Sequence, residues 1–193
     1  MKASSSTLTL SQAVFPRVAI WRDVLLVAGG SILTALCAQI AFFLPFSPVP
    51  LTGQMFAVLL VGATLGSRRG ALSMLTYIAI GATSIPFWFA PGKTVGIARL
   101  LSPSVGYLIG FVVAAFVVGW LAERGWDRRW YTSMAAMFAG TVVVWVFGWS
   151  VLRAFVPDAV VLVYVPGDII KLVLAALTLP SAWALVRRFQ KKA

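Results

Sequence analysis

Histidine is absent from this chain of 193 residues, and Cys37 is its single cysteine. Without histidine and without a group of cysteines, the sequence lacks the usual ligands of a transition-metal site and the base of a histidine-dependent triad. A single cysteine cannot form a disulfide bond within the chain, and its place in an apolar run indicates a small buried residue. We therefore expect neither a metal site nor catalytic residues.

Charged residues are also scarce, since they make up 11% of the chain while apolar residues make up 61%. The mean hydropathy is +0.95. A soluble domain usually carries about a quarter charged residues, because charge solvates its surface. So many apolar side chains cannot all be buried in one protein core, and many of them must face lipid. The composition therefore predicts an integral membrane protein.

Long uncharged segments divide the chain. They are continuously apolar rather than alternating, which is typical of spanning helices and not of barrel strands, and a spanning helix needs about 17–25 residues. Six segments qualify, at residues 24–44, 51–67, 70–90, 102–122, 131–152 and 166–186. The first 23 residues lack the layout of a signal peptide, so we expect the first segment to be retained. We predict an all-α fold: a compact bundle of six transmembrane helices in a single membrane domain, residues 1–193.

Basic residues outnumber acidic ones by 16 to 5, and they lie between the apolar segments. Lys and Arg in short loops mark the cytoplasmic side of a membrane protein. If the loops alternate, one side collects Lys93, Arg99 and Arg153. The other side collects twelve basic residues: Lys2, Arg17, Arg22, Arg68, Arg69, Arg124, Arg128, Arg129, Arg187, Arg188, Lys191 and Lys192. We therefore predict a multi-pass membrane protein with both termini in the cytoplasm.

Nucleic acid is not an expected partner, because the basic residues do not form a patch with interleaved aromatic residues. The sequence also has no nucleotide-binding loop of the P-loop type. Transport against a gradient would therefore require ATP hydrolysis by a partner subunit or an ion gradient.

Asp168 and Lys171 are the charged residues inside a predicted span, and charges within a membrane are costly. Their spacing of three places both on one helix face. One interpretation is structural: Asp168 complements the helix dipole, and Lys171 extends to the headgroups. The other is ligand binding, which Arg99 and Lys93 favour because they lie in a loop on the same side of the membrane.

Two further segments supply polar and aromatic groups at that side. The second segment begins with a proline-rich stretch, which places Gln54 near a helix N-terminus. Gln54 could bind a ligand there, or the stretch could be a simple proline turn. The proline- and glycine-rich stretch that follows Tyr77 predicts irregular backbone, which at membrane depth is tolerated in protein or beside a cavity. Tyr77, Phe87 and Trp88 could line an apolar pocket there, or they could belong to an interfacial aromatic belt.

Small residues form a stripe along the first segment, including Ser31, Ala35 and Ala38. Small residues let membrane helices approach each other closely. The stripe therefore indicates either packing within the bundle or docking to a partner membrane subunit.

The stretch ALCAQIAFFLPFSPVPLTGQMFAVLLVGATLGSRRGALSMLTYIAIGA, at residues 35–82, resembles the signature of the BioY family. GYLIGF at 106–111 and PGDIIK at 166–171 resemble the same family in the same order. The family comprises the biotin-specific substrate-binding (S) components of energy-coupling factor (ECF) transporters. The resemblance implies a six-helix, multi-pass protein of the bacterial cytoplasmic membrane that captures biotin from outside. A membrane-embedded coupling subunit and two ATPase subunits then drive release inside the cell.

The resemblance also implies roles for individual residues. Asp168 and Lys171 would contact the polar ends of biotin, and Arg99 would pair with its carboxylate. The small residues around Ala35 would dock on the coupling subunit. Biotin is the transported ligand, and no cofactor is implied.

The chemistry of biotin agrees with the residues available, because it has an apolar body, a ureido group and a carboxylate. The chain offers aromatic walls, hydrogen-bonding groups and cations: Tyr77, Phe87 and Trp88, then Asp168 and Gln54, then Lys171 and Arg99. A stand-alone, ion-coupled secondary vitamin transporter is the alternative, since Asp168 is the single acid within a predicted span and such acids often relay protons. A membrane enzyme ranks last, because no base and nucleophile are found together.

Overall fold

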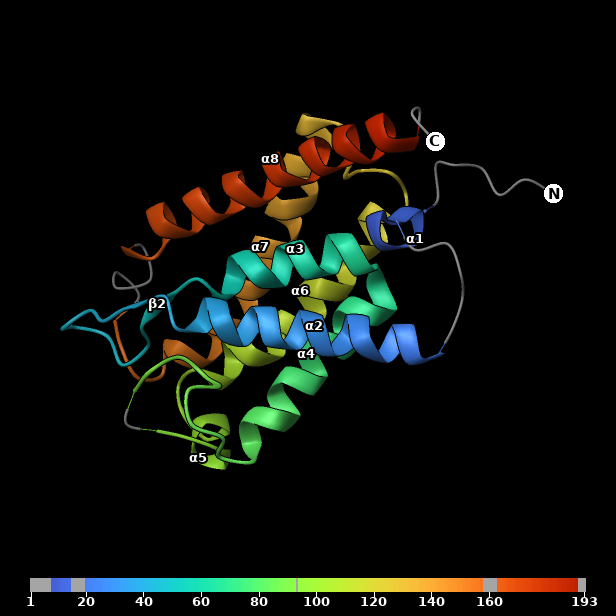
Figure 1. Cartoon of the computed structure of the whole chain (residues 1–193). Helices are drawn as coiled ribbons and strands as arrows, with labels where there is room; N and C mark the ends of the chain where they lie inside the picture. Colours follow the sequence, from blue (N-terminus) through green and yellow to red (C-terminus); the bar gives the residue numbers. More distant parts are fainter. Residues whose placement is uncertain (1–7, 15–19, 93, 158–162, 191–193) are drawn as a thin grey trace.

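The computed structural model describes residues 8–14, 20–92, 94–157 and 163–190, and Lys93 lies outside them. The described residues form helices and one short two-stranded sheet (Figure 1). In chain order these are α1 (Leu10–Val14), α2 (Ile20–Ala38), β1 (Ala41–Phe42), β2 (Leu51–Thr52), α3 (Gln54–Leu65), α4 (Ser67–Ala82), α5 (Ile97–Leu100), α6 (Val105–Ala122), α7 (Trp130–Leu152) and α8 (Val165–Gln190).

Four of these helices, α2, α6, α7 and α8, are long and apolar enough to cross a membrane. The segments predicted at 51–67 and 70–90 contain α3 and α4, which have 12 and 16 residues. Both are shorter than the roughly 17 residues that a spanning helix needs. The first predicted segment also ends early as a helix, because the chain leaves α2 at Ala38 and enters β1 three residues later.

A single residue, Gly66, separates α3 from α4. Its φ of 88° lies in the left-handed region that glycine adopts at no steric cost. The carboxylate of Glu123, just after α6, accepts hydrogen bonds from the Ser67 backbone N–H at 2.8 Å and from its hydroxyl at 2.9 Å. Glu123 therefore satisfies one of the free N–H groups that begin α4. Arg68 and Arg69, which follow the predicted segment 51–67, lie in the first turn of α4.

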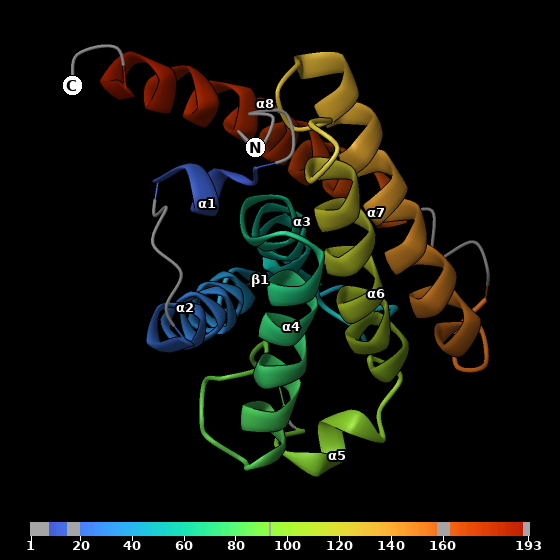
Figure 2. The same ribbon diagram turned by 90° about the vertical axis from the view of Figure 1, so that its right-hand side faces the viewer.

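Helix α3 lies at the centre of the bundle, where it contacts α2, α4, α6 and α8 (Figure 2). Ala57, Val58 and Leu59 are completely buried. Gly62 and Gly70 let α3 and α4 approach the backbone of Ala115 in α6, since a Cβ on Gly62 would lie 2.6 Å from the Ala115 carbonyl oxygen. The apolar core of the protein is therefore built around α3.

The two ends of the bundle differ. One end carries the β1–β2 ribbon, in which Ala41 pairs with Thr52 and Phe42 with Leu51, and it also carries α5 (Figure 1). The other end carries α1, which contacts α3 and α8, and the C-terminal part of α8. In the described part of the chain, the helices α2, α3, α4, α6, α7 and α8 run between these ends.

Candidate functional site

A cavity lies at the end of the bundle that carries β2 and α5. Its polar lining comes from Thr52, Gln54, Arg99, Ser104, Asp168 and Lys171. Its apolar and aromatic lining includes Met55, Phe89, Tyr107, Leu108, Phe111, Val144 and Tyr164. The cavity thus joins residues from β2, α3, α5, α6, α7 and α8, which are far apart in the sequence.

Asp168 lies in the first turn of α8 and is 6% exposed. The ammonium group of Lys171 donates to its Oδ1 at 2.8 Å, and the indole Nε1 of Trp145 in α7 donates to its Oδ2 at 2.8 Å. Both carboxylate oxygens are therefore engaged, and Lys171 neutralises the charge. A buried carboxylate needs such partners, because desolvation of an unpaired charge costs several kcal/mol.

Gln54 is the first residue of α3 and is 6% exposed. Its side-chain oxygen accepts a hydrogen bond from the Thr52 hydroxyl at 2.8 Å, and its Nε2 donates to the Tyr77 hydroxyl at 2.7 Å. These two partners fix the orientation of the amide. Gln54 thus presents an amide group of fixed orientation to the cavity.

Arg99 comes from the short helix α5 and is 7% exposed. Its Nη1 donates to the Thr94 hydroxyl at 3.2 Å. Among the residues that the structure describes, no carboxylate pairs with Arg99. Burial lowers the pKa of the guanidinium from its usual value, but arginine remains charged at physiological pH. Arg99 therefore leaves one positive charge in the cavity without a negative partner.

Aromatic side chains form much of the wall. Phe89 is 6% exposed and meets the ring of Tyr77 edge-on at a centroid distance of 5.4 Å. The hydroxyl of Tyr164 lies within hydrogen-bonding distance of the Val49 carbonyl oxygen and the Ser47 hydroxyl. Tyr164 thus links the segment before α8 to the loop between the two strands, and both sides of this link border the cavity.

The three predicted aromatic residues lie elsewhere. Tyr77 is fully buried behind Gln54, and Trp88 stacks on it at 6.1 Å and donates from Nε1 to the Tyr77 carbonyl oxygen at 2.8 Å. Phe87 is 81% exposed and does not belong to the cavity lining. Phe89, two residues further on, takes the position in the wall that the sequence analysis gave to Phe87 and Trp88.

The small residues predicted to dock on a partner face the interior of the bundle. Ser31, Ala35 and Ala38 are 0%, 5% and 0% exposed, and the Ser31 hydroxyl donates to the Ser73 carbonyl oxygen of α4 at 2.7 Å. Of the two interpretations of this stripe, these contacts support packing of α2 on α4. The exposed face of α2 is a different one and includes Leu36, which is 64% exposed.

The cavity combines two kinds of polar site with an apolar interior. Asp168 and Lys171 cancel each other's charge and still offer hydrogen-bonding groups, while Arg99 offers an unbalanced positive charge. Aromatic and aliphatic side chains line the space that these groups share. Such a site suits a small ligand with one anionic group, one neutral polar group and an apolar body.

The fold and the site define the class of this protein. It is a multi-pass helical membrane protein with a small-molecule pocket at one end of the bundle. The chain matches the BioY family over residues 4–188 and belongs to it.

Individual relatives agree with this assignment. "Biotin transporter BioY" of Rhizobium etli is 36% identical over 173 residues, covering 81% of this chain and 90% of that protein. "Biotin transporter BioY" of Thermotoga maritima is 41% identical over 140 residues, covering 69% and 80%. A crystal structure of the S-component for biotin from an ECF-type ABC transporter superposes with a TM-score of 0.69 at 23% identity, covering 92% of this chain and 96% of that one. At this level of identity, the superposition establishes a shared fold.

Several residues of the cavity escaped the sequence analysis. Tyr107 and Phe111 line the cavity, and Trp145 donates to its residue Asp168. All three lie in continuously apolar helices, where an aromatic residue that faces a cavity looks the same as one that faces lipid. Tyr164 precedes α8 by one residue and carried no motif. A spacing of four between Tyr107 and Phe111 places them on one helix face, which is the single signal that the sequence contained.

Proposed function

We propose that this protein is the substrate-binding subunit of an ECF-type transporter and captures biotin for uptake across the cytoplasmic membrane. It is a transport subunit and not an enzyme. The observation that carries the proposal is the unpaired, buried Arg99 in the same cavity as the neutralised Asp168–Lys171 pair. The names of the relatives in Rhizobium etli and Thermotoga maritima support biotin as the ligand.

Biotin fits this distribution of charge. Its carboxylate would pair with Arg99, and its ureido group would exchange hydrogen bonds with Asp168 and Gln54. The bicyclic ring and the valeryl chain would lie against Phe89 and Tyr107. A monoanionic ligand brings the charge of the occupied pocket to zero, which lowers the cost of burying Arg99.

In this proposal the six helices that run along the bundle are six membrane crossings, with α3 and α4 as the short second and third. Both termini lie in the cytoplasm and the pocket opens to the outside. The twelve-to-three distribution of Lys and Arg supports this orientation. The partners are a membrane-embedded coupling subunit and two ATPase subunits, since the chain has no nucleotide-binding loop of its own.

Equilibrium binding of radiolabelled biotin to the purified protein tests the ligand and the site together. We expect binding by the wild type. We expect at least about tenfold weaker binding by Lys171→Ala and Asp168→Asn, because each leaves a buried polar partner unsatisfied. Arg124→Gln is the control, since its guanidinium stacks on Trp120 away from the cavity. Unchanged affinity in both site variants would show that biotin binds elsewhere, and absence of binding would refute biotin as the ligand.

An ion-coupled carrier would differ from an S-component in proteoliposomes. The purified chain alone would then accumulate biotin, and a protonophore would abolish the accumulation. We expect no accumulation by the chain alone, because both oxygens of Asp168 are held by Lys171 and Trp145, which leaves this acid poorly placed to relay protons. Uptake should require the coupling and ATPase subunits together with ATP.

A further inference from the structure

A second hollow lies at the opposite end of the bundle from the biotin pocket, between the start of α2 and the start of α4. Its apolar wall includes Val24, Val27 and Leu72. Val24 is 60% exposed and Leu72 is 51% exposed, so this wall is open to the surroundings. Because the protein is embedded in a membrane, a wall of this kind contacts acyl chains.

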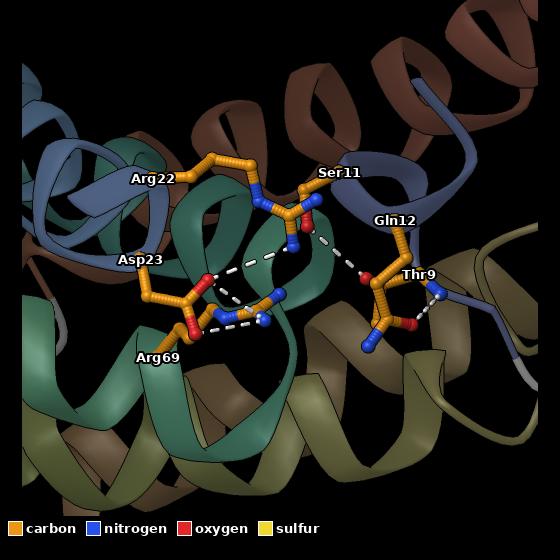
Figure 3. Close-up of polar contacts among 6 residues, drawn as sticks. All are labelled: Thr9, Ser11, Gln12, Arg22, Asp23 and Arg69. Carbon is orange, nitrogen blue, oxygen red and sulfur yellow. Dashed lines mark hydrogen bonds and ion pairs between the residues drawn. The ribbon is translucent and has the colours of Figure 1, made fainter. Parts of the chain in front are cut away.

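The charged border of the same hollow consists of Asp23, Arg68, Arg69 and Glu123. Figure 3 shows Asp23 and Arg69 of this border together with the neighbouring Arg22. Asp23 pairs through Oδ1 with Arg69 Nη2 at 2.9 Å, and the same oxygen lies 3.6 Å from Arg22 Nη2. One carboxylate thus serves two guanidinium groups. The Nη1 of Arg69 is buried and has no hydrogen-bond partner within the described part of the chain. The cluster therefore carries more positive than negative charge.

The neighbouring charged residues, Arg68 and Glu123, add one positive and one negative charge, so this imbalance stays the same. Arg68 is exposed, lines the hollow and forms no ion pair with any described residue. Glu123 also borders the hollow, but its carboxylate is occupied by the backbone N–H and the hydroxyl of Ser67. The polar border thus offers guanidinium N–H groups to an anion, next to an apolar wall.

We propose that this hollow binds an anionic diacyl phospholipid. The phosphate lies at Arg68 and Arg69, and one acyl chain runs along Val24, Val27 and Leu72. Guanidinium groups bind phosphate through paired N–H···O bonds, and basic pockets between membrane helices favour anionic headgroups. The proposal requires the membrane location of the chain and is independent of what the other pocket binds.

Native mass spectrometry of the full chain in detergent micelles tests the proposal. The protein is titrated with dioleoylphosphatidylglycerol or with dioleoylphosphatidylcholine, which has the same acyl chains and no net charge. We expect preferential retention of one phosphatidylglycerol. Arg68→Gln should weaken this binding about fivefold, which is the typical contribution of one basic residue near an anionic headgroup. Asp23→Asn should strengthen it, because Arg69 then lacks its competing carboxylate.

Arg124→Gln is the matched control, because Arg124 is an exposed arginine at the same end that stacks on Trp120 outside the hollow. It should bind the lipid like the wild type. Thermal unfolding and gel filtration establish that each variant is folded. Equal retention of both lipids would overturn the proposal, as would an equal loss in Arg68→Gln and Arg124→Gln. Displacement of the lipid by glycerol phosphate would also overturn it, since the site would then recognise the phosphate ester without the acyl chain.

Discussion

Arg99 is the residue whose charge gives the pocket its character. It is buried, it hydrogen-bonds to the neutral Thr94, and it faces the cavity that Asp168 and Lys171 also line. Burial of an unpaired charge is unfavourable, so an anionic ligand removes a cost that the empty pocket carries. The affinity for the ligand should therefore depend on a carboxylate in the ligand as strongly as on Arg99.

Replacing Arg99 with Gln should weaken biotin binding roughly 10–100-fold, because a hydrogen bond to a charged group contributes about 1.5–3 kcal/mol. The same substitution should change the binding of biotin amide much less, since the uncharged amide forms no ion pair with Arg99. Isothermal titration calorimetry with both ligands measures the difference. Equal losses for biotin and its amide would assign Arg99 a structural role instead.

Asp127 is a buried acid at the opposite end of the bundle, in the loop between α6 and α7. It is 0% exposed, accepts a hydrogen bond from Trp183 Nε1 of α8, and neighbours Arg128, whose guanidinium lies over the Trp183 ring. Burial raises the pKa of Asp127, although the Trp183 hydrogen bond and Arg128 act in the opposite direction. The folded state therefore holds this proton more tightly than the unfolded chain does.

The stability that Asp127 contributes should accordingly be complete below the unfolded pKa of about 3.9 and decrease as the pH rises through the folded value. Asp127→Asn removes this dependence. The melting temperature of the variant minus that of the wild type should increase between pH 4 and pH 7, as measured by thermal unfolding in detergent. Trp183→Phe in an otherwise wild-type chain should increase the loss of stability with rising pH, because the hydrogen bond that lowers the pKa of Asp127 is then absent. A constant difference across this range would contradict the assignment.

At the scale of elements, three helices meet at the single-residue break between α3 and α4. Gly119 of α6 lies so close that a Cβ on it would be 2.4 Å from the backbone carbonyl carbon of Gly66. Glu123, one turn further, caps the start of α4 through Ser67. The absence of a side chain at Gly119 therefore lets α6 hold both short helices in place.

Gly119→Ala should lower the free energy of unfolding by about 1–3 kcal/mol, which is typical of an overpacked core. Gly29→Ala is the matched control, because a Cβ on Gly29 of α2 would have no atom of another described element within 4 Å. Alanine favours helix over glycine, so this variant should be unchanged or slightly more stable. Thermal unfolding of the two purified variants measures the effect, and equal stability of both would contradict the close contact.

At the scale of the whole molecule, a short central helix makes room for the pocket. The 12 residues of α3 extend about 18 Å, which is well below the roughly 30 Å of the hydrocarbon core. The remaining depth at this end is occupied by β2, α5 and the loops, whose irregular backbone is tolerated because it borders a cavity within the protein. The floor of the pocket thus lies where α3 begins, at Gln54 and Met55.

Cysteine labelling tests how this bundle is oriented in the membrane. In a Cys37→Ala background, Val95→Cys and Arg124→Cys each place one exposed thiol at opposite ends. In intact cells, a membrane-impermeant maleimide should label the thiol at position 95 and leave the thiol at position 124 unlabelled. Both should react after the membrane is permeabilised. The reverse pattern would invert the proposed topology and place the proposed biotin pocket at the cytoplasmic face.

The sequence by itself determined the helical class and the membrane environment, because both follow from local composition: apolar residues without charges must form helices in lipid. It also identified Gln54, Arg99, Asp168 and Lys171, because polar residues within or beside apolar segments are costly and indicate a functional site. The structure brings these four residues into one cavity. Their number is small enough for each to be noticed.

The tertiary structure alone decided which groups face that cavity. Phe89 lines it, whereas Phe87 is 81% exposed. Phe87 lies in an irregular loop, with a φ of 59°, that no sequence period describes. The small-residue stripe of α2 packs on α4 through Ser31, and α6 approaches the junction of α3 and α4 closely at Gly66. These features depend on helix rotation and on contacts between residues far apart in the chain, which composition and spacing along one chain do not contain.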